Sequence, residues 1–264
     1  MRIALGLEYD GSGFSGWQSQ PSGNTAQDAL EVALSAVAGA PVRTICAGRT
    51  DAGVHALDQV VHFDAEMTRP LSAWVRGTNA HLPDSIVVRW AAGVTEDFHA
   101  RFAARSRSYR YVLLNRLERP GLFAGKVGWC HRSLDLASMQ AAAACLMGEH
   151  DFSSFRAAGC QAKSPIKTLS RCEITRQGEM FMFDFQANAF LHHMVRNLVG
   201  SIVYVGMRRQ STTWLAELLR ARDRSMAAPT FAPDGLYLTR VEYAPEWALP
   251  QQERIMACPQ FPIL

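Results

Sequence analysis

The chain has 264 residues, is 48% hydrophobic and 19% charged, and carries a net charge of +3. This length suits one large domain or two domains of roughly 100–150 residues each. The N-terminal residues lack the apolar core of a signal peptide, and no run of about 18 apolar residues predicts a membrane span. The six cysteines form no C-x-x-C pair, so we expect a cytoplasmic protein with reduced thiols and neither a disulfide scaffold nor a membrane anchor.

The first 104 residues predict the order strand, helix, strand, strand, helix, strand. Apolar side chains alternate along residues 3–9, which indicates a strand. A helix should follow, with Thr25 as its N-cap and Gly39 as its end. The other elements of this half are expected at residues 42–47 (strand), 60–63 (strand), 71–76 (helix) and 86–91 (strand).

Residues 105–244 repeat this order without visible sequence identity between the two halves. Strands are expected at residues 109–114, 169–176, 180–186 and 236–242, and helices at residues 136–147, 189–205 and 211–220. The second and third of these strands should form a hairpin that turns at Gln177 and Gly178. The order is that of a ferredoxin-like unit. We therefore expect an α+β fold of two ferredoxin-like βαββαβ halves, residues 1–104 and 105–244, with largely antiparallel sheets, helices on one face and an extension at residues 245–264.

A loop bracketed by glycines, AGRTDAGVHA at residues 47–56, carries the first candidate catalytic group. Such glycines let a substrate come close to the backbone. Arg49 and Asp51 are two residues apart, so their side chains lie on the same side of an extended segment. A neighbouring cation favours the ionised carboxylate, which suits a nucleophile better than a general acid. The same spacing is also typical of an Asx-type turn with a surface ion pair.

The segment FHARFAARSRSYRYVLLNR, residues 98–116, interleaves basic and aromatic side chains with no acid between them. Its arginines are Arg101, Arg105, Arg107, Arg110 and Arg116. Guanidinium groups contact phosphates, and an aromatic ring such as that of Tyr109 gives a base a stacking face. The pattern indicates contact with RNA, but it is equally typical of a solvated basic strand edge with structural tyrosines.

A single arginine, Arg196, interrupts the apolar stripe of the segment NAFLHHMVRNLVG at residues 188–200. His192 and Arg196 are four apart and would share one face of a helix. A buried guanidinium needs a carboxylate, and Asp51 is a candidate; alternatively, Arg196 lies at the stripe's edge and reaches water. The adjacent His192 and His193 would point in different directions on a helix, and no H-E-x-x-H motif occurs. We therefore expect no protein-bound catalytic metal.

Taken together, these segments resemble the tRNA pseudouridine synthase A family. The matching stretches are EYDGSGFSGWQ, AGRTDAGVHALDQVVHF, FHARF, RSYRY, GEHDFSSFR, NAFLHHMVRNLVGSIVYVG and DGLYL, which run in order from residue 8 to residue 238. The resemblance implies an isomerase that converts uridine to pseudouridine at positions 38, 39 and 40 of the tRNA anticodon stem-loop. It also implies no cofactor, a homodimer that shares the tRNA, and an active site in a cleft between two joined sheets.

The resemblance assigns Asp51 as the nucleophile and Arg196 as the arginine that pairs with it. Arg49 matches a motif arginine associated with base flipping, and Tyr109 matches the tyrosine that packs on the target base. The remaining candidates for contact with the RNA are Arg101, Arg107 and Arg110. Two rival functions remain: a tRNA-binding protein without catalysis, which would be expected to have lost Asp51, and a hydrolytic N-glycosidase, which would release free uracil.

Overall fold

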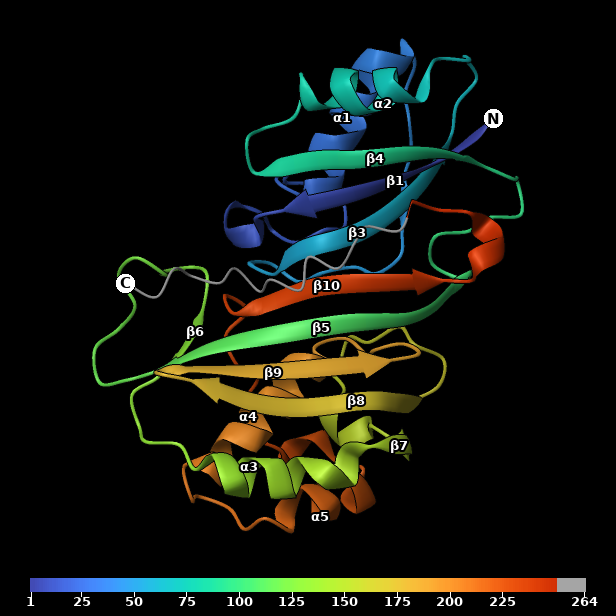
Figure 1. The fold of residues 1–264 in the computed structure, drawn as a ribbon. Helices are drawn as coiled ribbons and strands as arrows, with labels where there is room; N and C mark the ends of the chain where they lie inside the picture. The colour runs from blue at the N-terminus through green and yellow to red at the C-terminus, as the bar shows by residue number, and fades with distance from the viewer. Residues whose placement is uncertain (251–264) are drawn as a thin grey trace.

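The computed structural model describes residues 1–250, and these form a broad sheet with helices gathered beside each of its two ends (Figure 1). In the first half the strands are β1 (Arg2–Tyr9), β2 (Ile45–Cys46), β3 (His55–Asp64) and β4 (Ile86–Val94), and the helices are α1 (Ala26–Ala38) and α2 (Leu71–Asn79). The side chain of Thr25 caps α1 by accepting the N–H of Asp28, and Gly39, at φ 73°, ends the helix. Both helix ends are therefore where the sequence predicts them.

The second half is longer and more helical. Its strands are β5 (Ala104–Asn115), β6 (Gly128–Cys130), β7 (Gly148–Asp151), β8 (Ile166–Gln177), β9 (Met180–Ala187) and β10 (Leu236–Tyr243), and its helices are α3 (Leu136–Ala143), α4 (Met194–Gly206) and α5 (Trp214–Ala221). Strands β8 and β9 form the expected hairpin, in which Gln177 pairs with Met180 and Gly178 has a φ of 58°. The glycine at this turn allows the left-handed backbone that a two-residue connection requires.

Five of these elements differ clearly from the sequence-based expectation. Strand β2 is only two residues long, whereas residues 42–47 were expected. The helix expected at residues 136–147 ends at Ala143 and is followed by a 3-10 turn and by β7. Strands β6 and β7 were not expected, because three or four residues are too few to display a period-two pattern. Helix α4 begins at Met194 and not at residue 189, because His193 has a φ of 60°, which an α-helix cannot include.

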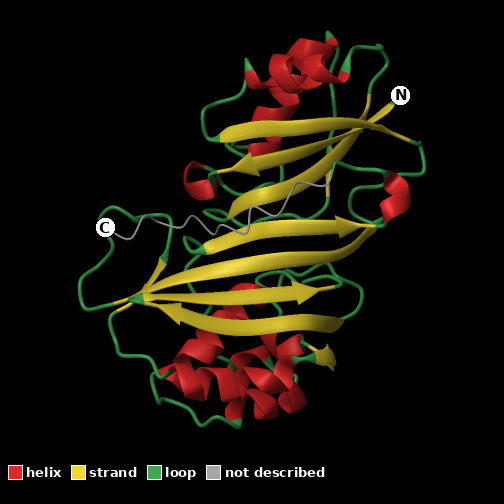
Figure 2. Cartoon of the chain, in the orientation of Figure 1, coloured by secondary structure: helices red, strands yellow, loops and turns green. Residues whose placement is uncertain are grey.

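All the strands of the described chain belong to one sheet, drawn in yellow in Figure 2. Its main path is β4-β1-β3-β10-β5-β9-β8-β7, with β2 beside β3 and β6 beside β5. Among the strand pairs of residues 1–250, only β3–β10 and β5–β6 are parallel. An α+β fold with a large, mixed and largely antiparallel sheet is thereby confirmed. The two halves meet where Tyr237 and Leu238 of β10 pair with His55 and Ala56 of β3.

A continuous apolar core extends through both halves beneath the sheet. On β9, every second side chain is buried, and these include Phe181, Phe183 and Phe185. In the first half Leu5 of β1 and Trp74 of α2 belong to the same cluster. Within residues 1–250, none of the helices combines the length and the apolar character that a bilayer crossing requires.

Helix α4 packs unusually closely against the segment that leads into β10. A Cβ added at Gly200 would lie 2.5 Å from the carbonyl oxygen of Pro229, which is a backbone atom and cannot swing aside. Two residues further along, the N–H of Phe231 donates to the carbonyl of Arg196 at 3.3 Å. Glycine at position 200 therefore fixes the distance between this segment and the start of α4.

We predict that Gly200→Ala lowers the free energy of unfolding by about 1–3 kcal/mol, because the added methyl group overpacks this contact. Urea denaturation of the purified protein measures the change. Gly121→Ala is the matched control, because a Cβ there meets no atom within 4 Å, and it should change the free energy of unfolding by less than about 0.5 kcal/mol. Equal unfolding midpoints for the two variants would contradict this account of Gly200.

Candidate active site

Asp51 lies on the loop between β2 and β3, and neighbouring backbone and side-chain contacts hold this loop in place. Thr50 is buried, and its hydroxyl lies 2.7 Å from that of Tyr9. On the other side of Asp51, Gly53 has a φ of 78°, a conformation that favours glycine. The sequence therefore builds a fixed turn here, and the carboxylate of Asp51 points out of it with 20% of its side chain exposed.

The carboxylate forms an ion pair with the first turn of α4. Nη1 of Arg196 donates to Oδ2 of Asp51 at 2.9 Å, and Nε donates to the carbonyl oxygen of Phe231 at 2.8 Å. The Arg196 side chain is only 14% exposed. The candidate carboxylate partner of Arg196 is thus in contact with it, across 145 positions of the sequence. A guanidinium held in this way by two acceptors fixes the direction of the carboxylate.

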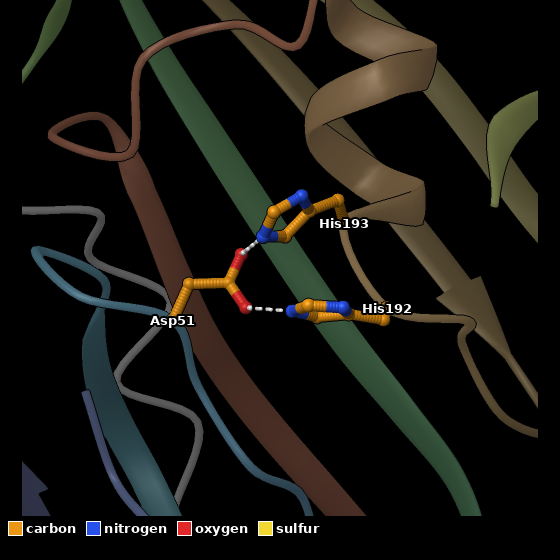
Figure 3. Close-up of side chains that lie close together, drawn as sticks. All are labelled: Asp51, His192 and His193. Atoms are coloured by element: carbon orange, nitrogen blue, oxygen red, sulfur yellow. Dashed lines mark ion pairs between the residues drawn. The ribbon is translucent and has the colours of Figure 1, made fainter. Parts of the chain in front are cut away.

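Two adjacent histidines complete the surroundings of this carboxylate (Figure 3). Nε2 of His192 lies 3.5 Å from Oδ1 of Asp51, and Nε2 of His193 lies 3.5 Å from Oδ2. The ring centroids are 3.9 Å apart. Burial lowers the pKa of His193 below its ordinary value, although the neighbouring Asp51 acts in the opposite direction, so His193 is mainly neutral at pH 7.

The prediction that the two imidazoles point in different directions is wrong. It assumed a helix from residue 189, but the left-handed backbone of His193 turns both rings toward Asp51. A left-handed residue that is not glycine is set by tertiary contacts and leaves no periodic signal. From Met194 onward the apolar side chains recur at regular helical spacing. This change is the signal that could have placed both histidines before the start of the helix.

The spacing of these three residues raises the question of a metal. Among residues 1–250, Asp51, His192 and His193 are a group whose potential ligand atoms all lie within 4.8 Å of one another. The guanidinium of Arg196 already contacts the same carboxylate at 2.9 Å. A second cation beside it would be repelled, so a metal-free site remains our proposal.

Asp51 opens into a cavity of about 770 Å³ at the seam between the two halves. Its lining includes Arg49, Asp51, Arg101, Tyr109, His192 and Arg196. Tyr109 comes from β5, is almost buried and packs edge-to-face against Phe190, with ring centroids 5.1 Å apart. Burial raises the pKa of its hydroxyl, which therefore stays a neutral phenol at physiological pH.

The arginines expected to contact RNA have different surroundings. Arg49 and Arg101 are exposed and line the cavity; Nη1 of Arg49 donates to Gln161 at 3.3 Å. Arg107 lies in the cavity wall but is only 8% exposed, and Arg110 forms a two-point ion pair with Asp184 of β9. Only Arg49 and Arg101 therefore present exposed guanidinium groups at the cavity.

Arg107 ties together three backbone segments. Its guanidinium donates to the carbonyl oxygens of Ala47, Arg101, Ala104 and Asn188. These carbonyls belong to the Asp51 loop, to the segment around the start of β5 and to the segment before α4. The expectation that Arg107 contacts a phosphate does not fit this geometry, because its donors are already directed at the protein. The sequence did not indicate this structural role of Arg107, because the spacing of charges in residues 98–116 does not distinguish a carbonyl partner from a phosphate.

Comparison with known proteins supplies the family context. Residues 7–103 and 142–244 match the family model described as tRNA pseudouridine synthase. The chain is similar to proteins named "tRNA pseudouridine synthase A" from Dechloromonas aromatica, at 63% identity over 95% of each chain, and from Aromatoleum aromaticum, at 60% identity over 100% of each chain. A chain in a solved Cbf5-Nop10-Gar1 complex aligns with 89% of this chain and 48% of its own length, at 11% identity and a TM-score of 0.36, a likeness too distant to carry an argument.

We predict that Arg107→Lys lowers the free energy of unfolding by about 2 kcal/mol, because an ammonium group cannot satisfy the carbonyls that the guanidinium now contacts. The exposed Arg105, which lies 3.7 Å from the carboxylate of the equally exposed Glu246, provides the control. Arg105→Lys should change the free energy of unfolding by less than about 0.5 kcal/mol. If thermal and urea unfolding show the two variants to be equally stable, the tethering role of Arg107 is wrong.

Proposed function

This chain belongs to the tRNA pseudouridine synthase family and is an isomerase, and on that premise we propose that it converts uridine to pseudouridine at positions 38, 39 and 40 of the tRNA anticodon stem-loop. The observation that carries the proposal is the Asp51–Arg196 ion pair in the wall of a cavity. The family match extends over both halves that contribute to that pair.

The chemistry of the reaction suits an ionised carboxylate. Isomerisation breaks the bond between N1 of the base and C1′ of the ribose, turns the base, and joins C5 to C1′. A carboxylate serves this sequence by attacking the ribose or the base, or by assisting departure of the base anion. We propose that Asp51 is this group. Arg196 supports it, because a hydrogen-bonded ion pair at 2.9 Å fixes the direction of the carboxylate.

Substrate binding requires the uridine to leave the helical stack, which costs a few kcal/mol. We propose that Tyr109 packs on the flipped base, since its ring lies in the cavity wall and is itself braced by Phe190. Arg49 and Arg101 contact phosphates, or the position in the stem that the flipped uridine leaves, because both are exposed and line the cavity. Arg110 is more distant from this arrangement, since its partner is Asp184 and it is absent from the cavity wall.

We further propose two ferredoxin-like halves, residues 1–104 and 105–244, with residues 245–264 as an extension. Strand order supports this division: β4-β1-β3-β2 in the first half corresponds to β10-β5-β9-β8 in the second. Of the extension, residues 251–264 lie outside the described residues. We also propose a homodimer and a cytoplasmic location, where tRNA is found; the cysteines of the described chain are all free.

We predict that Asp51→Asn abolishes pseudouridine formation, with a loss of about 1,000-fold or more, while tRNA affinity stays within a few-fold of wild type. Asparagine keeps the shape of the side chain but cannot act as an anionic nucleophile. Single-turnover assays with an unmodified tRNA transcript, read out by nucleoside analysis, measure the loss. Asp84→Asn, an exposed change outside the cavity, is the control.

The same assay separates the rival functions. Near wild-type turnover by Asp51→Asn would exclude Asp51 as the nucleophile. Free uracil released by the wild-type protein would identify a hydrolytic N-glycosidase, and tRNA binding without any product would identify a binding protein.

A second prediction concerns phosphate contact by Arg101. Arg101→Gln should weaken tRNA binding and reduce the slope of log affinity against log salt concentration by about 1, because one contact with a phosphate is lost. Arg220→Gln removes the same charge from the exposed side of α5, outside the cavity, and should leave the slope unchanged. Identical slopes for both variants and the wild type would exclude Arg101 from phosphate contact.

A further inference from the structure

The proposed reaction leaves one proton to be removed, and neither Asp51 as nucleophile nor Arg196 as its partner accounts for it. Once C5 of the base has joined C1′, C5 carries both its original hydrogen and the sugar. Pseudouridine forms only when that C5 proton departs. Its electron pair then restores the C5=C6 double bond, the N1=C6 pair returns to N1, and N1 takes a proton from water. This step needs a proton acceptor close to C5 while the base is bound beside Asp51.

Few groups around Asp51 can accept a proton. The Arg196 guanidinium is a donor only. The Tyr109 hydroxyl is a neutral phenol in a buried position. The thiol of Cys160 also lines the cavity, where its sulfur accepts the backbone N–H of His192 at 3.3 Å, and the experiment below tests it as a rival acceptor. The two imidazoles of Figure 3 are the bases that face the carboxylate directly.

The two histidines are not equivalent. His193 faces Oδ2 of Asp51, the oxygen that already accepts from Arg196, and its side chain is 29% exposed. His192 faces Oδ1, which receives no bond from Arg196, and its side chain is 46% exposed. A base bound in the cavity can thus reach Nε2 of His192 without displacing the ion pair. His192 is the better placed acceptor of the two.

Backbone contacts fix His192 in this position. Its N–H donates to the sulfur of Cys160, and its carbonyl oxygen accepts the N–H of Ala157 at 3.1 Å. The next residue, His193, has the left-handed backbone that turns both rings toward Asp51. A strained conformation held by several neighbours is typical of functional sites, and a fixed base is what proton transfer in a short-lived complex requires.

We infer that His192 accepts the C5 proton of the target uridine, with His193 as a positioning residue that holds the ring against Asp51. The imidazolium that forms is stabilised by Oδ1 of Asp51 beside it and then returns its proton to water, so the overall reaction stays an isomerisation. An ion-paired carboxylate is a weaker acceptor at neutral pH than a neutral imidazole, which is why the proton goes to His192. The inference rests on the proposed pseudouridine synthase activity.

The test uses the full-length protein and a tRNA transcript made with uridine that carries deuterium at C5. His192→Gln retains a polar side chain but cannot accept a proton. We expect single-turnover pseudouridine formation to slow by about 100-fold, with unchanged tRNA affinity. A primary isotope effect from C5 deuterium, absent in the wild type, should appear because proton removal becomes rate-limiting.

Two further variants keep the result interpretable. His192→Ala should recover activity when imidazole is added, which a merely misfolded protein would not do. His81→Gln, an exposed change outside the cavity, should match the wild type in rate and isotope effect. A wild-type rate without an isotope effect in His192→Gln would overturn the inference, and so would an isotope effect that appears in Cys160→Ser instead. No pseudouridine from the wild type would instead refute the proposed function.

Discussion

The site depends on one short stretch of parallel pairing, where β3 and β10 join the two halves of the sheet. Only two residue pairs form this junction, Tyr237 with His55 and Leu238 with Ala56. Strand β3 starts directly after the loop that carries Asp51, and β10 starts directly after the segment that contacts Arg196 through Phe231. The junction therefore brings together two charged side chains that belong to different halves of the chain.

Charge in this cavity is balanced by hydrogen bonds as well as by ion pairing. The Asp51–Arg196 pair is mostly shielded from water, and such a pair is stable only when its remaining donors are also satisfied. The carbonyl oxygen of Phe231 meets that need on the arginine side. The donors of Arg107 are likewise satisfied, in its case by four backbone carbonyls. The Arg196 guanidinium thus pairs with the proposed nucleophile, Asp51. The Arg107 guanidinium holds together the backbone segments that surround the cavity.

The features of the structure that could be predicted from the sequence are those that depend on local patterns and on the cost of burying charge. The helix ends at Thr25 and Gly39, the β8–β9 hairpin and the antiparallel character of the sheet follow from capping, turn chemistry and period-two alternation. An arginine in an apolar stripe indicated a carboxylate partner, with Asp51 as the candidate and an Arg196 that reaches water as the alternative, and the structure shows the first of these. The orientation of His192 and His193 did not follow, since it depends on a left-handed backbone that distant segments impose. Nor could charge spacing tell that Arg107 and Arg110 are engaged within the protein.

Because the site takes residues from both halves, it can be completed only late in the synthesis of the chain. Asp51 is made early and Arg196 much later, and β10 is the last strand within residues 1–250. The Asp51–Arg196 pair can therefore form only after residues of both halves have been synthesised and have met at the β3–β10 junction, and a chain cut short before Arg196 lacks the cation of the site.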